Sequence, residues 1–235
     1  MAGRLNSPIW RHDAFVLRRL QTVVQAVVKA LSAREVLSKS ARVVDFGCGD
    51  APYKSLFDSS CREYLRCDLE GSDLADVHFK ENEELPLESH TADCVVSFQV
   101  LEHVWEVQHY LAECKRVLRP EGRLILSTHG VWLYHPHPGD YRRWTGDGLR
   151  KELELAGFEV LEVHPVVGPL AWTTQFRSLA YHHLFSRLGW LGRAVSAVVC
   201  TLMYGRMWVE DRVTPASIRD TNASVYLLVA KPVVK

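Results

Sequence analysis

Residues 43–51 (Val-Val-Asp-Phe-Gly-Cys-Gly-Asp-Ala) constrain the fold of this chain more than any other stretch. Two β-branched residues run into Asp45 and then into Gly47 and Gly49, which are spaced as Gly-Xaa-Gly. β-Branched residues favour strands, and glycines permit the tight turns in which a ligand approaches the backbone closely. The pattern predicts a buried strand that ends in a ligand-binding turn.

A second acid strengthens this interpretation. Residues 64–68 predict another short strand, which closes on Asp68 about twenty residues after the glycines. In nucleotide-binding βαβ units an acid at this place accepts hydrogen bonds from a ribose diol. Pro52 stands where dinucleotide-binding loops carry a third glycine, and the chain has no Walker lysine motif. We therefore expect an adenosine-containing cofactor without a di- or triphosphate.

From residue 41 onward the sequence alternates strand and helix patterns, which favours a parallel sheet covered on both faces. A chain of 235 residues, 47% hydrophobic, is long enough for one domain of this type. The prediction is an α/β, Rossmann-like, doubly wound and mostly parallel seven-stranded sheet. Its expected strands are 42–46, 63–67, 76–79, 93–98, 122–128, 158–164 and 224–231, and its expected helices are 52–58, 105–118 and 145–156.

The remaining segments divide the single domain into parts. Residues 1–40 are expected to form an N-terminal helical cap, because apolar residues recur at helical spacing within 13–37. This helix either packs against the sheet or closes over the cofactor. Residues 41–165 form the expected cofactor-binding core, 166–223 an apolar helical insertion, and 224–235 the last strand.

The insertion carries much apolar surface outside the expected core. Its uncharged run from Ala194 to Tyr204 is about half of the roughly 20 residues that a bilayer span needs. We expect no transmembrane segment, and two helices that form a lid or a homodimer surface. Peripheral membrane contact is the third alternative.

Charge and cysteine content narrow the class further. Lysine plus arginine equals aspartate plus glutamate at 28 each, and basic residues form no run longer than a pair, so nucleic acid is not an expected partner. The six cysteines include no Cys-Xaa-Xaa-Cys pair, and no signal peptide is visible. These features favour a cytoplasmic protein.

The stretch 128–145 follows a predicted strand and concentrates histidines, prolines and aromatic residues, which is typical of a loop over a binding site. Three interpretations stay open. His129, His135, His137 and Asp140 could bind a divalent metal, although their spacing matches no established ligand motif and the prediction is that they bind none. A histidine could act as general base, with His135 and His137 the best candidates. Asp140, Tyr141 and Arg142 could instead lock the loop onto the sheet.

In order and spacing the motifs resemble those of class I S-adenosylmethionine-dependent methyltransferases over residues 40 to 165. The pattern His-Xaa-Xaa-Pro-Xaa-Asp-Tyr-Xaa-Arg, here residues 135–143 with Trp144-Thr145 after it, together with Pro52-Tyr53-Lys54, resembles a methyltransferase type 11-like branch frequent in bacterial glycan and secondary-metabolite pathways. Pro136 departs from that branch, in which an acid is common. The residues that carry the resemblance are 44–49, 68, 85–87, 92–97, 100–104 and 116–124.

The resemblance implies S-adenosylmethionine as cofactor and S-adenosylhomocysteine as product. It also implies roles for individual residues. The implied cofactor-binding residues are Asp45, Gly47, Cys48, Gly49, Asp68, Leu69, Glu81, Gln99 and His103. The candidate catalytic residues are His135, His137, His129 and Asp140, and the candidate acceptor-binding residues are Tyr141, Arg142, Trp132 and Tyr134.

The function expected from these residues is methylation of a small molecule, with O-methylation of a sugar, a glycan precursor or a natural product as the leading hypothesis. The alternative is C- or N-methylation of an aromatic or quinone-like acceptor, which needs no strong base. A third alternative is a non-catalytic cofactor-binding partner subunit whose interface is the apolar insertion.

Overall fold

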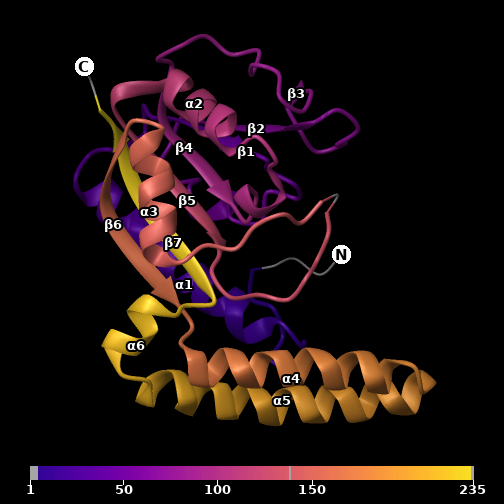
Figure 1. Ribbon diagram of the computed structural model, residues 1–235. Coiled ribbons are helices and arrows are strands. Elements are labelled where there is room, and N and C mark those ends of the chain that lie inside the picture. Colours follow the sequence, from indigo (N-terminus) through magenta and orange to yellow (C-terminus); the bar gives the residue numbers. More distant parts are fainter. Residues whose placement is uncertain (1–4, 138, 234–235) are drawn as a thin grey trace.

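A computed structural model describes residues 5–137 and 139–233 of the chain. Pro138, one of the prolines in the 128–145 stretch, lies outside the described residues. One seven-stranded sheet organises the molecule, in the order β3-β2-β1-β4-β5-β7-β6 (Figure 1). Its strands are β1 (Arg42–Phe46), β2 (Glu63–Leu69), β3 (Val77–Phe79), β4 (Ala92–Phe98), β5 (Leu118–His129), β6 (Phe158–Val166) and β7 (Val225–Pro232).

The sheet is parallel except at β7. This strand inserts between β5 and β6 and runs antiparallel to both of them. The pairs β1–β2, β1–β4, β2–β3 and β4–β5 are all parallel. The predicted doubly wound, mostly parallel sheet is therefore confirmed, and every predicted strand is present.

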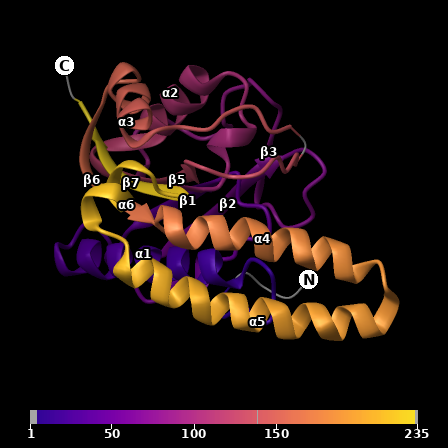
Figure 2. The ribbon, with the colours of Figure 1, turned by 60° about the horizontal axis from the view of Figure 1, so that its bottom comes forward.

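Helices cover both faces of the sheet, as a sheet that is apolar on both sides requires. Helix α1 (Ala14–Ala33) packs Phe15, Leu20 and Val24 into one core, against side chains of β1, β4 and β7. Helices α2 (Val107–Val117) and α3 (Gly146–Leu155) pack into a second core on the opposite face. Figures 1 and 2 show α1 on one side of the sheet and α2 with α3 on the other.

The expected helix at 52–58 is wrong. The chain forms only the 3-10 turn η1 (Lys54–Leu56), flanked by Tyr53 and Phe57, which are both fully buried. A backbone of positive φ at Ala51 directly before Pro52 keeps the segment in a turn. Two anchoring aromatic side chains fix its position without a full helix.

The insertion before β7 is helical, as expected. It consists of α4 (Pro169–Ser186), α5 (Gly189–Val213) and the short α6 (Ala216–Thr221). Helices α4 and α5 form an antiparallel hairpin that extends away from the sheet (Figure 2). Among the described residues, no helix combines the length and the apolar character that crossing a bilayer requires. All six cysteines are free.

Candidate functional site

A cavity of about 970 Å³ opens at the carboxyl ends of the parallel strands. Its floor comes from the residues that follow β1, β2 and β4, and from His129 at the end of β5. Helix α1 contributes Val16, Leu17 and Leu20 to the opposite wall. Ligands of open α/β sheets bind in this position, at the point where strand order reverses. The volume suffices for a cofactor and a small acceptor together.

The glycine turn at the end of β1 has the geometry that its sequence predicts. Gly47 and Gly49 have φ values of +78° and +53°. The amides of Gly47 and Cys48 both donate to the carbonyl of Cys67, at 2.8 and 3.0 Å. A Cβ atom on Gly47 would lie 2.7 Å from Val100 Cγ1, so the turn has no room for a side chain there. Its backbone is therefore exposed to the cavity.

Asp68, near the end of β2, joins this turn. One of its carboxylate oxygens accepts the Gly49 amide at 2.9 Å, and the other accepts the Leu69 amide at 2.8 Å. Each carboxylate oxygen can accept more than one hydrogen bond. Asp68 therefore keeps acceptor capacity toward the cavity, as a ribose diol requires.

Asp45 forms part of the cavity floor from the end of β1. Its carboxyl group is almost completely buried and accepts a hydrogen bond from the Tyr64 hydroxyl at 2.8 Å. Burial raises the pKa of Asp45 to about 7, against the opposing effect of the Tyr64 hydrogen bond. This acid therefore changes charge near neutral pH.

All the predicted cofactor residues line the cavity. Among them, Gln99 adopts a positive φ of 59° and donates from Nε2 to the Ser127 hydroxyl at 3.1 Å. Its backbone conformation turns the chain directly after β4. The full set is Asp45, Gly47, Cys48, Gly49, Asp68, Leu69, Glu81, Gln99 and His103.

The charge of the lining suits a cationic cofactor. Seven carboxylate side chains line the cavity, whereas Arg11 is the single lysine or arginine among its described lining residues. A sulfonium with an ammonium group is stabilised by such surroundings, and a polyphosphate is repelled. The glycine turn, the free acceptor capacity of Asp68 and the acidic lining together fit S-adenosylmethionine.

A buried acid–histidine pair lies beside this cofactor region. Glu102 follows β4 and is fully buried, and one of its oxygens lies 2.7 Å from Nδ1 of His129. Its other oxygen accepts the Thr128 hydroxyl, also at 2.7 Å. Burial alone would raise the pKa of Glu102, but the His129 ring and these hydrogen bonds favour the carboxylate and hold its pKa below the ordinary value. Glu102 is thus a buried anion that orients a histidine.

His135 lies next to this pair, with its ring centroid 4.7 Å from that of His129 and 5.0 Å from that of His103. Burial and the neighbouring His129 lower the pKa of His135 to about 4. The Nδ1 atom of His103 hydrogen-bonds the Gly139 carbonyl. Near neutral pH, His135 is therefore uncharged.

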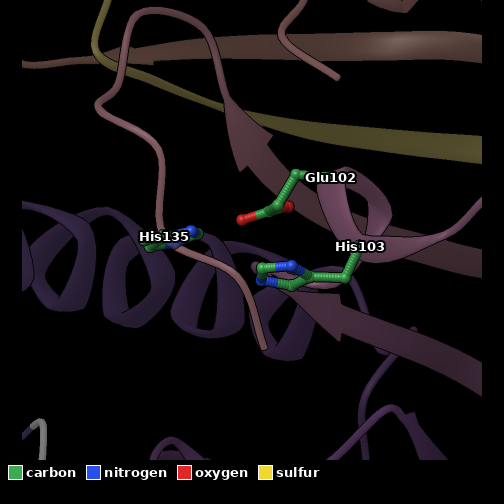
Figure 3. A group of neighbouring side chains, drawn as sticks. All are labelled: Glu102, His103 and His135. Carbon is green, nitrogen blue, oxygen red and sulfur yellow. The ribbon is translucent and has the colours of Figure 1, made fainter. Parts of the chain in front are cut away.

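Glu102, His103 and His135 also form a group with potential ligand atoms for a metal ion (Figure 3). One ligand atom from each lies within 4.8 Å of the others. This set shares only His135 with the one that the loop spacing suggested, because Glu102 and His103 enter it while His129, His137 and Asp140 do not. The Glu102 carboxylate of this group is also the one that lies 2.7 Å from Nδ1 of His129.

The predicted loop lock is present, and its central residue is Arg143. The guanidinium contacts both carboxylate oxygens of Asp140, at 2.5 and 2.7 Å, and also donates to the carbonyls of Trp132 and Leu133. Asp140 further accepts the His135 amide at 2.8 Å. The Arg143 guanidinium holds the pKa of Asp140 well below its usual range. The loop is thereby closed on itself.

Four of the predicted site residues lie outside the described cavity lining. The carboxylate of Asp140 is committed to Arg143, so its contacts support a structural role instead of a catalytic one. Arg142 donates to the Val104 carbonyl and lies over the Trp105 ring, while the Tyr141 ring packs against the same tryptophan. These residues fasten the loop to the segment after β4, and Tyr134 is exposed. His129, His135, His137 and Trp132 do line the cavity.

Sequence patterns alone did not identify the residues that form the cavity wall opposite the strands. The cavity is lined by Arg11, Asp13 and the α1 residues Val16, Leu17 and Leu20, and no described residue of α4 or α5 takes part. The N-terminal helix thus packs on the sheet and also borders the cavity. The two alternatives for this helix, packing against the sheet and covering the cofactor site, are therefore compatible. The amphipathic spacing of α1 predicted which of its residues are buried. It did not predict which of those residues line the cavity.

Comparisons with known proteins point to methyltransferases. A family model described as a methyltransferase domain matches residues 44–126. A Mycolicibacterium smegmatis protein named "Probable S-adenosylmethionine-dependent methyltransferase" is 29% identical over 97% of this chain and 93% of its own length. A similarly named Mycobacterium tuberculosis protein is 30% identical over 67% of this chain and 61% of its own length.

A solved structure supports the fold. The Burkholderia thailandensis 1,6-didemethyltoxoflavin-N1-methyltransferase, crystallised with 1,6-didemethyltoxoflavin and S-adenosylhomocysteine, superposes with a TM-score of 0.55 at 17% identity. The match covers 91% of this chain and 78% of that one. At this identity the likeness concerns the fold alone.

The sheet is Rossmann-like, and the lining of its cavity fits a cationic nucleoside cofactor. With the family match and the named relatives, these features identify the chain as a class I S-adenosylmethionine-dependent methyltransferase. S-Adenosylmethionine is its cofactor.

Proposed function

We propose that this methyltransferase acts on a hydroxyl oxygen of a small molecule, such as a sugar, a glycan precursor or a natural product, and that His129 is the general base. The observation that carries the proposal is the 2.7 Å contact between Nδ1 of His129 and the buried carboxylate of Glu102. His129 also lines the cavity, next to the cofactor residues.

The acid–histidine pair suits a hydroxyl acceptor because such a group must lose its proton as it is methylated. When bound, S-adenosylmethionine supplies an electrophilic methyl group. The Glu102 carboxylate, 2.7 Å from Nδ1 of His129, favours the proton on Nδ1, which leaves Nε2 as the acceptor for the hydroxyl proton. The Glu102 carboxylate then stabilises the imidazolium that results, and Thr128 fixes the second carboxylate oxygen.

The other histidines are weaker candidates for the base. The lowered pKa of His135, about 4, makes it a poor proton acceptor near neutral pH. His137 lines the cavity but has no carboxylate contact among the described residues. We assign both to orientation of the acceptor, together with Trp132, whose ring stacks on His129 with centroids 5.1 Å apart.

The aromatic rings that line the cavity, those of Trp132 and the histidines, support the alternative function, which is C- or N-methylation. A planar acceptor could stack against Trp132 and the histidine rings and be methylated at carbon or nitrogen without a strong base. The Burkholderia neighbour is named as an N1-methyltransferase. Dependence on His129 distinguishes the two functions, because only the hydroxyl acceptor requires proton removal by that residue.

The test measures S-adenosylhomocysteine release in the presence of a panel of sugars, glycolipids and aromatic nitrogen heterocycles. With a hydroxyl acceptor, we expect His129→Gln to lower kcat by about 10²–10⁴-fold. Glu102→Gln should lower kcat as well and shift its pH profile. The matched control is His137→Gln, which changes a histidine in the same cavity and should mainly affect KM.

S-Adenosylhomocysteine affinity, measured by calorimetry, should stay within a few-fold of wild type in all three variants. Turnover confined to heterocycles, or an unchanged kcat in His129→Gln, would contradict the proposal. A rate abolished by EDTA and restored by a divalent cation would also contradict it, and would instead assign Glu102, His103 and His135 to a metal site.

A further inference from the structure

The α4–α5 hairpin joins the sheet core at its base, and farther along it contacts the N-terminal segment through His12 and Trp10. At the base, Asp211 accepts the Gly168 amide at 2.9 Å and pairs with Arg19 of α1, also at 2.9 Å. Ala171 and Met207 join the core at the same end. The other end of the hairpin extends away from the sheet in both views (Figures 1 and 2). Most of its length is therefore not needed to cover the sheet.

The contact between the two helices consists of small and polar side chains. Ser178 donates to Cys200 across the hairpin at 3.5 Å, and His182 contacts the Ser196 hydroxyl at 3.0 Å. Gly192 brings the backbones close, because a Cβ atom there would lie 1.9 Å from the Phe185 carbonyl oxygen. Small residues and interhelical hydrogen bonds are how helices pack where the surroundings are apolar.

The large apolar side chains point the other way. Along α5 they recur at intervals of three, four or seven residues, and they are exposed along most of the helix, with Leu202 at 70%. This arrangement, polar inside and apolar outside, is the reverse of what a helix in water adopts. The apolar stripe consists of Leu191, Val195, Val198, Leu202, Val209 and Val213, and Leu184, Leu188 and Trp190 extend it around the turn.

The charge of the hairpin indicates what covers this stripe. Between residues 169 and 213 there are five arginines and two acids, although the whole chain is neutral. Both acids are already paired, Glu210 with Arg206 and Asp211 with Arg19. Arg177, Arg187 and Arg193 have no carboxylate partner among the described residues. Exposed leucines and tryptophans flanked by unpaired arginines complement an anionic lipid surface.

We propose that the α4–α5 hairpin is the surface with which this enzyme docks onto an anionic phospholipid bilayer. The apolar stripe enters the headgroup region, and the arginines contact lipid phosphates. A second copy of the chain would bring the same positive charge to this face. Charge repulsion therefore disfavours self-association through the hairpin.

Docking would also set the position of the cavity. Trp10 packs beside Val198 and Leu202 of the stripe, and the adjoining Arg11 and Asp13 line the cavity. His12, between them, has its ring centroid 4.3 Å from that of His182 in α4. The cavity thus borders the hairpin, which favours an amphiphilic acceptor that resides in the membrane. This last point rests on the proposed function, whereas bilayer binding does not.

The test is flotation of the purified protein with vesicles of phosphatidylcholine alone, or of phosphatidylcholine and phosphatidylglycerol at three to one. We expect binding to the anionic vesicles and at least tenfold weaker binding to the neutral ones. Arg187→Gln with Arg193→Gln should weaken binding by roughly 30-fold, since each arginine contributes about 1 kcal/mol. Leu188→Gln with Leu191→Gln should weaken it at least tenfold.

Matched controls are Leu155→Gln and Arg150→Gln on α3, which change an equally exposed leucine and arginine outside the hairpin. Neither should change binding, and every variant should keep wild-type affinity for S-adenosylhomocysteine. Equal binding to both vesicle types, no binding, or equal loss in the α3 controls would overturn the proposal. A dimer that Leu188→Gln with Leu191→Gln dissociates, in a protein that binds no vesicles, would show that a second copy covers the stripe.

Discussion

Gly47 illustrates how much depends on one residue in the cofactor turn. Its φ of +78° is costly for any residue with a side chain, and a Cβ atom would meet Val100 at 2.7 Å. The turn can accept alanine only if its backbone moves, and that backbone lines the cavity. Cofactor binding should therefore be more sensitive to this position than the overall fold.

We predict that Gly47→Ala weakens S-adenosylhomocysteine binding at least tenfold, because the left-handed conformation alone costs roughly 1–2 kcal/mol for an L-residue. Calorimetric titration measures the affinity. The control is Gly205→Ala in α5, where a Cβ atom has no neighbour within 4 Å and φ is not positive. That change should leave affinity unaltered; an unaltered affinity in Gly47→Ala as well would contradict the geometry of the turn.

At this scale the residues predicted from the sequence to bind the cofactor all line the cavity, whereas the acid–histidine pair was not predicted. Gly47, Gly49 and Asp68 are recognisable because each lies at or just after the end of a strand, so their placement depends on local sequence. The pairing of Glu102 with His129 depends on β4 and β5 being parallel neighbours in register, with Phe98 opposite Ser127. The available signal was that both residues closely follow those strand positions, but burial of the carboxylate could not be predicted from it.

Among the elements, the 130–144 loop owes its shape to one side chain. Arg143 holds Asp140 and the carbonyls of Trp132 and Leu133, so it joins both branches of the loop. The sequence pattern indicated a lock but assigned it to Asp140, Tyr141 and Arg142. Adjacent arginines are indistinguishable in the sequence, and only the backbone direction decides which one turns inward.

We predict that Arg143→Ala lowers the free energy of unfolding by about 2 kcal/mol or more, because it leaves the buried Asp140 carboxylate without its partner. It should also raise KM for the acceptor more than it lowers kcat. Urea unfolding and steady-state kinetics provide the two measurements.

The control for this change is Lys151→Ala, which removes an exposed ion pair with Glu154 and should cost less than about 0.5 kcal/mol. Equal losses in the two variants would mean that the Asp140–Arg143 contact is no stronger than a surface pair.

For the molecule as a whole, the buried Asp45 should make stability depend on pH. Its folded pKa of about 7 lies above the ordinary value of 3.8, so the native state retains a proton that the unfolded state has already released. The contribution of this group to stability is full below pH 4 and is lost as the pH rises toward 7.

We predict that Asp45→Asn removes this loss. Relative to wild type, the variant should gain stability between pH 4 and pH 7, by at most about 4 kcal/mol at 1.36 kcal/mol per pKa unit. Urea unfolding across this range measures the gain, and Asp58→Asn, at an exposed position, should show no such trend. A difference that stays constant with pH would show that Asp45 does not titrate in this range.

The sheet was the most predictable feature of the whole molecule, because alternating strand and helix patterns restrict the topology to few choices. The direction of the insertion was not predictable. Its helices follow from apolar residues and helix formers, but a side chain such as Leu202 looks the same in sequence whether it enters a core or faces outward. The signal in the sequence was a set of small residues, Ser178, Ser196 and Cys200. Through these residues the two helices pack against each other.

The position of β7 has a consequence for how the protein is made. This strand fills the gap between β5 and β6 and is translated after the whole α4–α5 hairpin. A nascent chain at that stage has two open strand edges and an uncovered apolar stripe, and both promote aggregation. We expect the yield of active enzyme in a cell to depend on how quickly β7 docks after it leaves the ribosome, and on how well chaperones protect the chain until then.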